Sequence, residues 1–166
     1  MNWYALRGEY LQPVGFKKLF EGFYVRESYS LFMRLAGDLI VENGSLVFIT
    51  PDTFINSNLH KGLRKYLFEN FTVSHLITFP SSFFPGVDYG YGKMCITAAT
   101  RKTPDSEHCV RLVQITESDG VLALSAGPDF ANSRTILLEN DKILRDIEVG
   151  ILCASSVVNG AAAKPA

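Results

Sequence analysis

The chain has 166 residues, and its 16 Lys and Arg residues against 17 Asp and Glu residues give a formal net charge of −1. This length is typical of one domain, and a composition with 47% hydrophobic and 20% charged residues excludes wholesale disorder. The charge balance excludes a small protein that binds nucleic acid through overall positive charge. Any nucleic-acid contact must come from a local patch.

Membrane and secretory segments are not expected. The sequence has no apolar run of about 18 residues, which a membrane-spanning helix needs, and its start lacks the pattern of a signal peptide. The three cysteines, Cys95, Cys109 and Cys153, are odd in number and have no CxxC spacing. We therefore expect mostly buried, reduced thiols in a cytoplasmic protein, and no disulfide or metal site.

The N-terminal part predicts a loop followed by a helix. Residues 1–27 predict loop with one short helix around Phe16–Phe20, because proline and glycine interrupt any longer period. From Ser28 to Ile40 apolar residues recur at helical spacing, and Ser28 is expected to cap the helix start. Asn43 and Gly44 are expected to end this helix, with Gly44 in the left-handed conformation.

A strand and a second helix follow. The continuous apolar run Leu46–Ile49 lies between Gly44 and Pro51 and predicts a strand over residues 45–50 that is buried on both faces, as in a parallel sheet covered by helices. Ser57 is expected to cap the next helix. Its apolar side carries Leu59, Leu63, Tyr66 and Leu67, and its opposite side carries His60, Lys61, Arg64 and Lys65.

Three further strands and one helix are predicted. The strands cover Val73–Phe79, Met94–Thr100 and Val110–Ile115, and the loop Ser81–Gly92 joins the first two. A last helix is predicted around Asn140–Ile147, and residues 151–166 are expected to be disordered or truncated. This alternation of helices and strands predicts an α/β layer fold. His60, His75 and His108 are far apart in sequence and are expected to be surface or core histidines, so the chain predicts no metal site.

Residues 28–102 resemble the adenine-specific (N6) DNA methyltransferases of the Taq-type and fused restriction–methylation class. The resemblance rests on the order of Asn43-Gly44, the strand and turn Leu46–Phe54, Ser57, Leu63–Leu67, the strand Val73–Phe79, Phe83–Val87 and the final strand with Arg101-Lys102. It implies a partial Rossmann-like S-adenosylmethionine-dependent methyltransferase fold. Residues 28–102 would hold the later strands and helices of a doubly wound sheet that ends in a strand–loop–strand, and residues 103–150 would form an extension with strands and one helix.

The function implied by the resemblance is methyl transfer from S-adenosylmethionine to a flipped adenine in double-stranded DNA, as part of a restriction-modification system. In this family an aromatic side chain of the late loop stacks on the flipped base. Phe84, which precedes Pro85, matches that position, and Phe83 is the alternative. Asp88, Tyr89 and Tyr91 would border the base pocket. The simpler interpretation is that both phenylalanines fill the core under a loop.

Five basic residues are candidates for contacts with DNA phosphates: Lys61, Arg64, Lys65, Arg101 and Lys102. The competing interpretation is an ordinary solvated helix face, since one side of a surface helix is usually charged.

One departure from the family pattern concerns the catalytic centre. The family's Asn/Asp-Pro-Pro-Tyr/Phe motif, glycine-rich cofactor loop and acidic ribose contact have no match here, so we expect no catalytic residue in this chain. In the family these motifs precede the helix at Ser28, so an upstream segment or subunit is expected to supply them. The chain would then be a split subunit, a shortened gene product or an expressed fragment. The alternative is a non-catalytic DNA- or protein-binding module or an inactive gene remnant.

Overall fold

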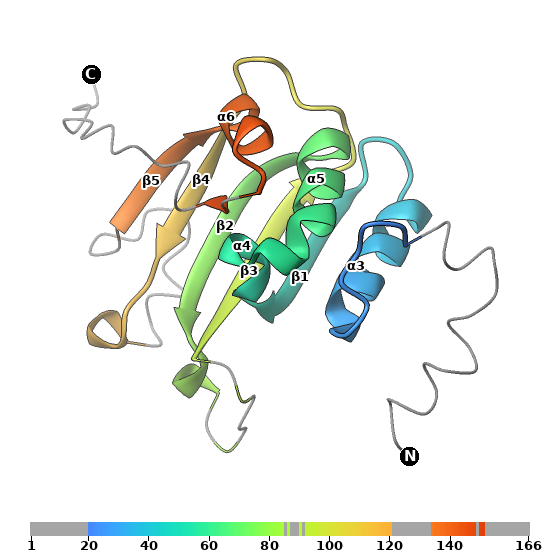
Figure 1. Cartoon of the computed structure of the whole chain (residues 1–166). Coiled ribbons are helices and arrows are strands. Elements are labelled where there is room, and N and C mark those ends of the chain that lie inside the picture. The colour runs from blue at the N-terminus through green and yellow to red at the C-terminus, as the bar shows by residue number, and fades with distance from the viewer. Residues whose placement is uncertain are drawn as a thin grey trace, which may run out of the picture.

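The computed structural model describes residues 20–84, 86, 90, 92–120, 134–148 and 150–151. Its helices are α3 (Ser28–Leu39), α4 (Thr53–Asn56), α5 (Lys61–Asn70) and α6 (Asn140–Arg145), and short 3-10 turns are η1 (Asn58–His60), η2 (Ser81–Phe83) and η3 (Glu117–Asp119). Its strands are β1 (Ser45–Pro51), β2 (Thr72–Pro80), β3 (Lys93–Thr100), β4 (Cys109–Gln114) and β5 (Arg134–Glu139) (Figure 1).

The strands form one five-stranded sheet in the order β1-β3-β2-β4-β5. Strands β1 and β2 both pair antiparallel with β3, β2 pairs parallel with β4, and β4 pairs antiparallel with β5. The four helices lie together on one face of the sheet (Figure 1). The predicted α/β class is confirmed, and so is the pair of strands joined by the loop after residue 80, but the sheet is mostly antiparallel.

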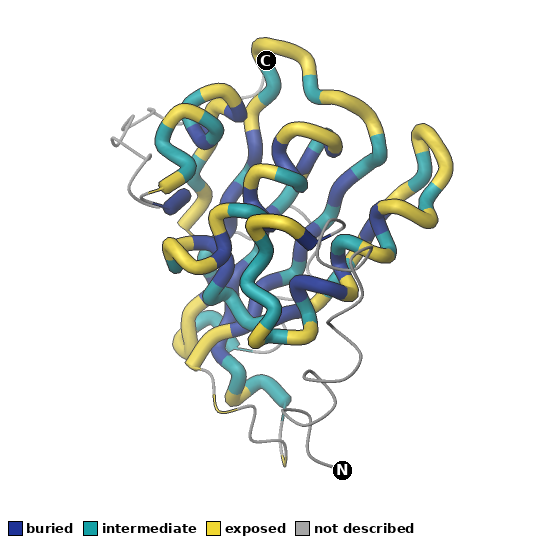
Figure 2. The backbone as a smooth tube through the Cα atoms, turned by 45° about the vertical axis from the view of Figure 1, so that its right-hand side comes forward, coloured by how far each residue is buried: buried dark blue, intermediate teal, exposed yellow. Residues whose placement is uncertain are grey.

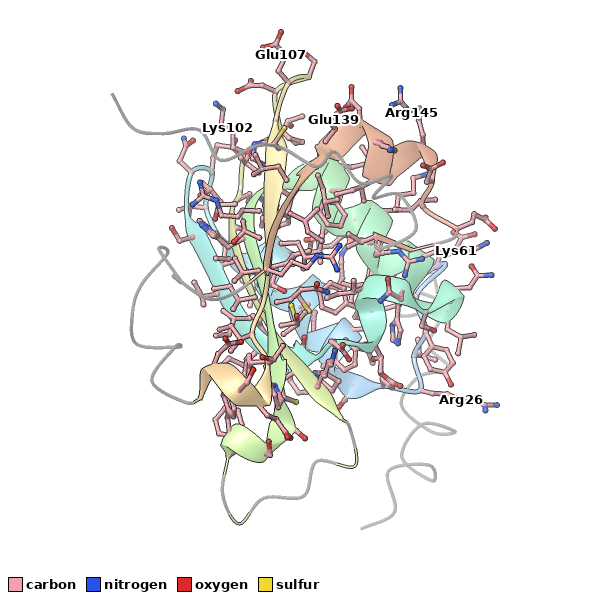
Figure 3. The ribbon with its side chains drawn as sticks, turned by 90° about the vertical axis from the view of Figure 1, so that its left-hand side faces the viewer. Arg26, Lys61, Lys102, Glu107, Glu139 and Arg145 are labelled. Atoms are coloured by element: carbon pink, nitrogen blue, oxygen red, sulfur yellow. The ribbon has the colours of Figure 1, made fainter. Side chains whose placement is uncertain are left out.

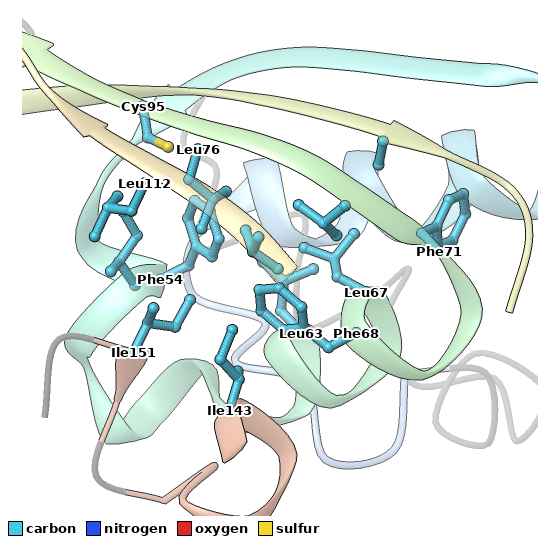
Figure 4. Packing of buried hydrophobic residues seen from close by; sticks show 14 of the residues in the cluster. Phe54, Leu63, Leu67, Phe68, Phe71, Leu76, Cys95, Leu112, Ile143 and Ile151 are labelled. Carbon is cyan, nitrogen blue, oxygen red and sulfur yellow. The ribbon is translucent and has the colours of Figure 1, made fainter. Parts of the chain in front are cut away.

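The core lies between the helices and the sheet. Leu63, Leu67 and Phe68 of α5 pack against Leu76 of β2 and Leu112 of β4, and all five side chains are buried (Figure 4). A smaller cluster of Phe79, Met94, Val113 and Ile115 contacts the partly buried Phe83 and Phe84. Because side chains alternate along a strand, Leu76 and Phe79 of β2 point to opposite faces. The smaller cluster therefore lies on the face away from the helices. In Figure 2 the buried stretches of the tube lie inside the molecule and the exposed stretches lie around its outside.

The ends of α3 differ from the prediction. The residue before the helix is Glu27, and Ser28 is its first residue rather than its cap. The left-handed residue after the helix is Asn43, with φ 62°, and not Gly44. Gly44 is needed for space instead, because a Cβ atom there would lie 2.5 Å from Ile40 Cγ2. At the next helix the expected cap is confirmed in a modified form: Ser57 Oγ accepts a hydrogen bond from the backbone N–H of Leu59, in η1 before α5.

The predicted environment of β1 is wrong. We expected a strand buried on both faces of a parallel sheet, but β1 is an edge strand that is antiparallel to its neighbour β3. Leu46 and Thr50 face the helices and are buried, whereas Val47 and Ile49 point to the other face and are 66% and 50% exposed. The apolar run thus predicted the strand itself. The position of β1 in the sheet depends on its pairing with β3, which lies far along the chain.

Other expectations have mixed outcomes. Cys95 is buried and Cys109 is exposed, and both are free thiols, so only one of these two is buried as predicted. Cys153, the short helix expected around Phe16–Phe20 and the tail from residue 152 lie outside the described residues. Strand β5 was not predicted individually. None of the helices in the described ranges is long and apolar enough to cross a membrane.

Candidate functional site

The carboxyl ends of strands β1 and β2 lie at the same end of the sheet, which we call the carboxyl edge. Strands β1 and β2 run in the same direction because both are antiparallel to β3. The backbone N–H of Asp52 donates to Lys93 O at 3.3 Å, and that of Ser81 donates to Gly92 O at 3.2 Å, so both strand ends are attached to the start of β3. In α/β folds, ligands bind at the carboxyl ends of the strands. This edge is therefore the candidate functional site.

The two aromatic residues proposed from sequence lie at this edge. Phe83 and Phe84 follow β2 and are half-buried. Their ring centroids lie 6.2 Å and 5.8 Å from the ring of Phe79, with interplanar angles of 24° and 56°. Phe79 is buried, so it forms an apolar base for both rings. Asp88, Tyr89 and Tyr91, the other predicted members of a base pocket, lie outside the described residues.

Polar side chains on the helix side of this edge are buried by packing and do not contact solvent. Thr50, Cys95 and Thr78 lie side by side across β1, β3 and β2, and all three are buried. Burial raises the pKa of the Cys95 thiol to about 12. A thiol with this pKa stays protonated at neutral pH and is a poor nucleophile. Burial also raises the pKa of Asp52, although the nearby Lys93 ammonium opposes the shift.

A buried polar cluster that the sequence did not reveal joins α3 to the segment after β1. His60 Nε2 lies 3.0 Å from Tyr29 Oη and 3.2 Å from the Glu27 carboxylate. Thr53 Oγ1 donates to the same carboxylate at 3.2 Å and lies 2.8 Å from Tyr29 Oη. His60 is 1% exposed, and its Nδ1 has no hydrogen-bond partner among the described residues. These four side chains come from three separate elements, so neither charge pattern nor spacing indicated the cluster.

Arg64 does not lie on the solvated face of α5, and the expectation that it contacts phosphates is corrected. Its side chain is fully buried. Its Nη1 donates to Phe54 O at 2.8 Å and Ser57 O at 2.6 Å, and its Nη2 donates to Ile147 O at 2.6 Å. A guanidinium engaged with these carbonyl oxygens would have to leave the interior to reach DNA. Its role is to join α4, the turn before η1 and the segment after α6.

The other four basic residues do not form a single patch. Arg101 Nη1 donates to the carbonyl oxygens of Gly37 and Ile40, where it satisfies the last turn of α3. Lys61 and Lys102 lie on opposite sides of the molecule (Figure 3). Lys61 pairs with Glu148 at 2.8 Å, Lys65 with Glu69 at 3.9 Å and Lys102 with Asp105 at 3.8 Å. Arg101 therefore has a structural role, and the three exposed lysines sit in surface ion pairs.

Two surface cavities lie away from the candidate site. One of about 520 Å³ is lined by α5, residues 21–23 and residues 147–148. The other, of about 370 Å³, lies at the C-terminal end of α3 beside Arg101, at the opposite end of β1 from Pro51. Within the described ranges no group of three or more His, Cys, Asp or Glu residues is placed to hold a metal ion.

Two comparisons with known proteins agree with this geometry. Residues 10–84 match the family model of the Eco57I restriction-modification methylase. The match supports a restriction-modification methylase family. Among solved structures, the type IIG restriction endonuclease BpuSI is similar with a TM-score of 0.56 and 14% sequence identity. No curated protein sequence matches the chain.

The match with BpuSI covers 76% of this chain and 16% of the BpuSI chain. At this identity the similarity shows a shared fold. This chain therefore spans about a sixth of that restriction enzyme.

The described residues do not fit S-adenosylmethionine, the methyl donor expected from sequence. At the carboxyl edge Thr50, Thr78 and Cys95 are packed against the helices. Both cavities lie elsewhere, and charged side chains line them.

Replacing Arg64 tests its structural role. Arg64→Met removes the guanidinium hydrogen bonds to the carbonyl oxygens of Phe54, Ser57 and Ile147, so we expect the free energy of unfolding to fall by about 3 kcal/mol. Lys65→Met, the neighbouring change on the exposed side of α5, should alter it by at most about 0.5 kcal/mol. Urea unfolding followed by circular dichroism measures both. Equal effects of the two changes would contradict the buried role.

The buried histidine predicts a pH dependence of stability. Burial lowers the pKa of His60 below its ordinary value of 6.5, and Arg64 adds to this effect, while the Glu27 carboxylate opposes it. As the pH falls below about 6.5, the unfolded chain binds the proton more readily than the folded chain, so stability falls. We expect the free energy of unfolding to decrease more steeply between pH 7.5 and 5 in the wild type than in His60→Gln, in urea titrations at both pH values. Identical slopes would contradict this assignment.

Proposed function

We propose that this chain is part of a site-specific DNA methyltransferase of a restriction-modification system, which transfers a methyl group from S-adenosylmethionine to the N6 atom of a flipped adenine. The observation that carries the proposal is the match of residues 10–84 to the Eco57I methylase family. Adenine as the target base comes from the resemblance of residues 28–102 in sequence. The catalytic motif and the cofactor loop are assigned to another polypeptide segment, upstream in the same protein or in a separate subunit.

The contribution of this chain is to hold the target base. Phe84 lies at the carboxyl edge of the sheet, on an apolar base made by Phe79. A ring supported from one side and half-exposed is suited to stack on a flipped base, and such stacking contributes about 1–3 kcal/mol per base. Phe83 has the same support and is the alternative stacking residue.

Exposed lysines are assigned to the DNA backbone. Lys61 and Lys65 of α5 are held only by surface ion pairs. Such pairs contribute little free energy, so a phosphate can replace the carboxylate partner. Lys102 is not included, because it lies on the opposite side of the molecule from Lys61. Arg64 and Arg101 are left out of this assignment because their guanidinium groups bind backbone carbonyl oxygens.

Reconstitution tests the proposed function. The 166-residue chain is mixed with the polypeptide encoded directly upstream of it, tritium-labelled S-adenosylmethionine and double-stranded DNA. We expect label in DNA only when both polypeptides are present, and N6-methyladenine as the product after digestion to nucleosides. An inactive mixture, or methylcytosine as the product, would overturn the proposal. An inactive mixture in which this chain binds DNA alone would favour the non-catalytic module.

Substitution of the aromatic pair tests the stacking assignment. Phe84→Ala in the reconstituted enzyme should weaken binding of a duplex carrying 2-aminopurine at the target position by about 5- to 150-fold, the loss of one base–aromatic stack. The fluorescence increase of 2-aminopurine on flipping measures it. Phe83→Ala tests the alternative assignment, because Phe83 lies against the same Phe79 ring and the variant that loses flipping identifies the stacking residue. If both variants flip the base as the wild type does, the assignment fails.

A further inference from the structure

Two exposed cations lie at the carboxyl edge without an ion-pair partner. Lys93 begins β3, and its carbonyl oxygen accepts a hydrogen bond from the backbone N–H of Asp52, just after β1. Arg26 precedes Glu27, whose carboxylate accepts a hydrogen bond from Thr53, the residue after Asp52. Unlike the paired lysines of α5, neither cation forms an ion pair with another described residue. Figure 3 shows Arg26 extending away from the ribbon into solvent.

The strand order places both cations on one side of the aromatic pair. In the sheet β3 lies between β1 and β2, and Phe83 and Phe84 follow β2. Because neighbouring strands are about 4.8 Å apart, Lys93 lies about one strand spacing from the turn that carries the two rings. Arg26 lies farther along, next to α3, which packs beside β1 (Figure 1). The aromatic pair, Lys93 and Arg26 therefore follow one another along the edge.

The other side of the aromatic pair carries acidic residues. The turn η3 follows β4, which pairs with β2 on the side away from β3. It contains Glu117 and Asp119, whose carboxylates accept hydrogen bonds from Ser82 and Thr116. Carboxylates repel a phosphate and cations attract it. A DNA strand that reaches the aromatic pair is therefore drawn toward β3 and α3 and away from β4.

Carboxylates on the cation side are partly withdrawn from solvent. Glu27 belongs to the buried polar cluster, where its carboxylate lies 3.2 Å from His60 Nε2. Asp52 is half-buried, and burial raises the pKa of its carboxyl group. Both therefore oppose an approaching phosphate less than the exposed Glu117 does. The exposed charge beside β3 and α3 comes mainly from Lys93 and Arg26.

We propose that Lys93 and Arg26 bind the phosphate backbone of the DNA strand that holds the target base, so that this strand runs along the carboxyl edge from the aromatic pair toward α3. Lys93 contacts a phosphate next to the flipped nucleotide, and Arg26 contacts one farther along on the same side. Flipping rotates the nucleotide about its backbone, so cations that hold the neighbouring phosphates fix the axis of rotation. The choice of DNA as the ligand rests on the proposed function.

Salt dependence tests both cations without requiring methylation. The probe is a short mixed-sequence DNA duplex, and fluorescence anisotropy measures its binding to this chain together with the polypeptide encoded directly upstream, at several NaCl concentrations. Lys93→Met and Arg26→Met should each reduce the slope of log K against log salt by about one, because each removes a phosphate contact. Both side chains are exposed, so the circular dichroism of the chain should not change.

Arg134→Met is the matched control. Arg134 is also exposed at the carboxyl edge and forms no ion pair with another described residue, but it begins β5, beyond the acidic turn η3. It lies away from the proposed path of the DNA strand. We therefore expect this variant to keep the salt slope of the wild type.

Neutral phosphates test the direction of the strand. Methylphosphonate, which lacks the phosphate charge, replaces one phosphate at a time on each side of the target nucleotide, in a duplex that the reconstituted enzyme methylates. We expect two sensitive positions on the same side, where the substitution weakens binding to the wild type about tenfold. Lys93→Met should be insensitive to the substitution at the nearer position, and Arg26→Met to that at the farther one.

Several results would overturn the inference. These are absence of DNA binding, wild-type salt slopes in Lys93→Met and Arg26→Met, an equal loss of slope in Arg134→Met, and sensitive phosphates on opposite sides of the target nucleotide. Failure of the inference and of the proposed function are distinguishable. Salt slopes that depend on Lys93 and Arg26 without any methylation would support the DNA contacts and contradict the methyltransferase. Methylation with unchanged salt slopes would do the reverse.

Discussion

The helical layer depends on one buried cation. The guanidinium of Arg64 donates to the backbone carbonyl oxygens of Phe54 in α4, of Ser57 and of Ile147 after α6. Burying a charge is unfavourable unless hydrogen bonds replace the lost water, and here three carbonyl groups do so. The same hydrogen bonds satisfy backbone carbonyl oxygens in short segments, which form few hydrogen bonds within themselves. Because α4 and α6 are too short to be stable in isolation, Arg64 fixes how they lie over the sheet.

The fixed helical layer determines which side chains are accessible at the carboxyl edge of the sheet. On the helix side, Thr50, Thr78 and Cys95 are packed away from solvent, so that side is structural. On the other side, Phe79 supports two half-buried rings next to the loop after β2. The two faces of this edge therefore differ, with buried polar side chains on the helix side and half-buried aromatic rings on the other. It is consistent with a methylase segment that is joined to a larger enzyme.

Local patterns predicted most of the helices and strands, although not β5, while contacts between residues far apart in sequence determine where each element lies in the fold. The helix over residues 28–39 and the strands β2, β3 and β4 follow from apolar spacing, which is a property of short windows. The position of β1 at an edge depends on β3, some 50 residues later. Arg64 lies between Lys61 and Lys65 on the same helix, so the sequence pattern did not distinguish the buried cation from the two exposed ones. The cluster around His60 could likewise not be predicted from the sequence, because its members come from three elements that contact one another only in the folded chain.

The position of β3 between β1 and β2 has a consequence for the order of folding. During synthesis α3 and β1 leave the ribosome before β3, so β1 has neither of its edges paired until residues 93–100 emerge. Strand β2 is made in that interval, but it pairs with β3 and not with β1. The sheet can therefore close only after β3 has been made and has entered between β1 and β2.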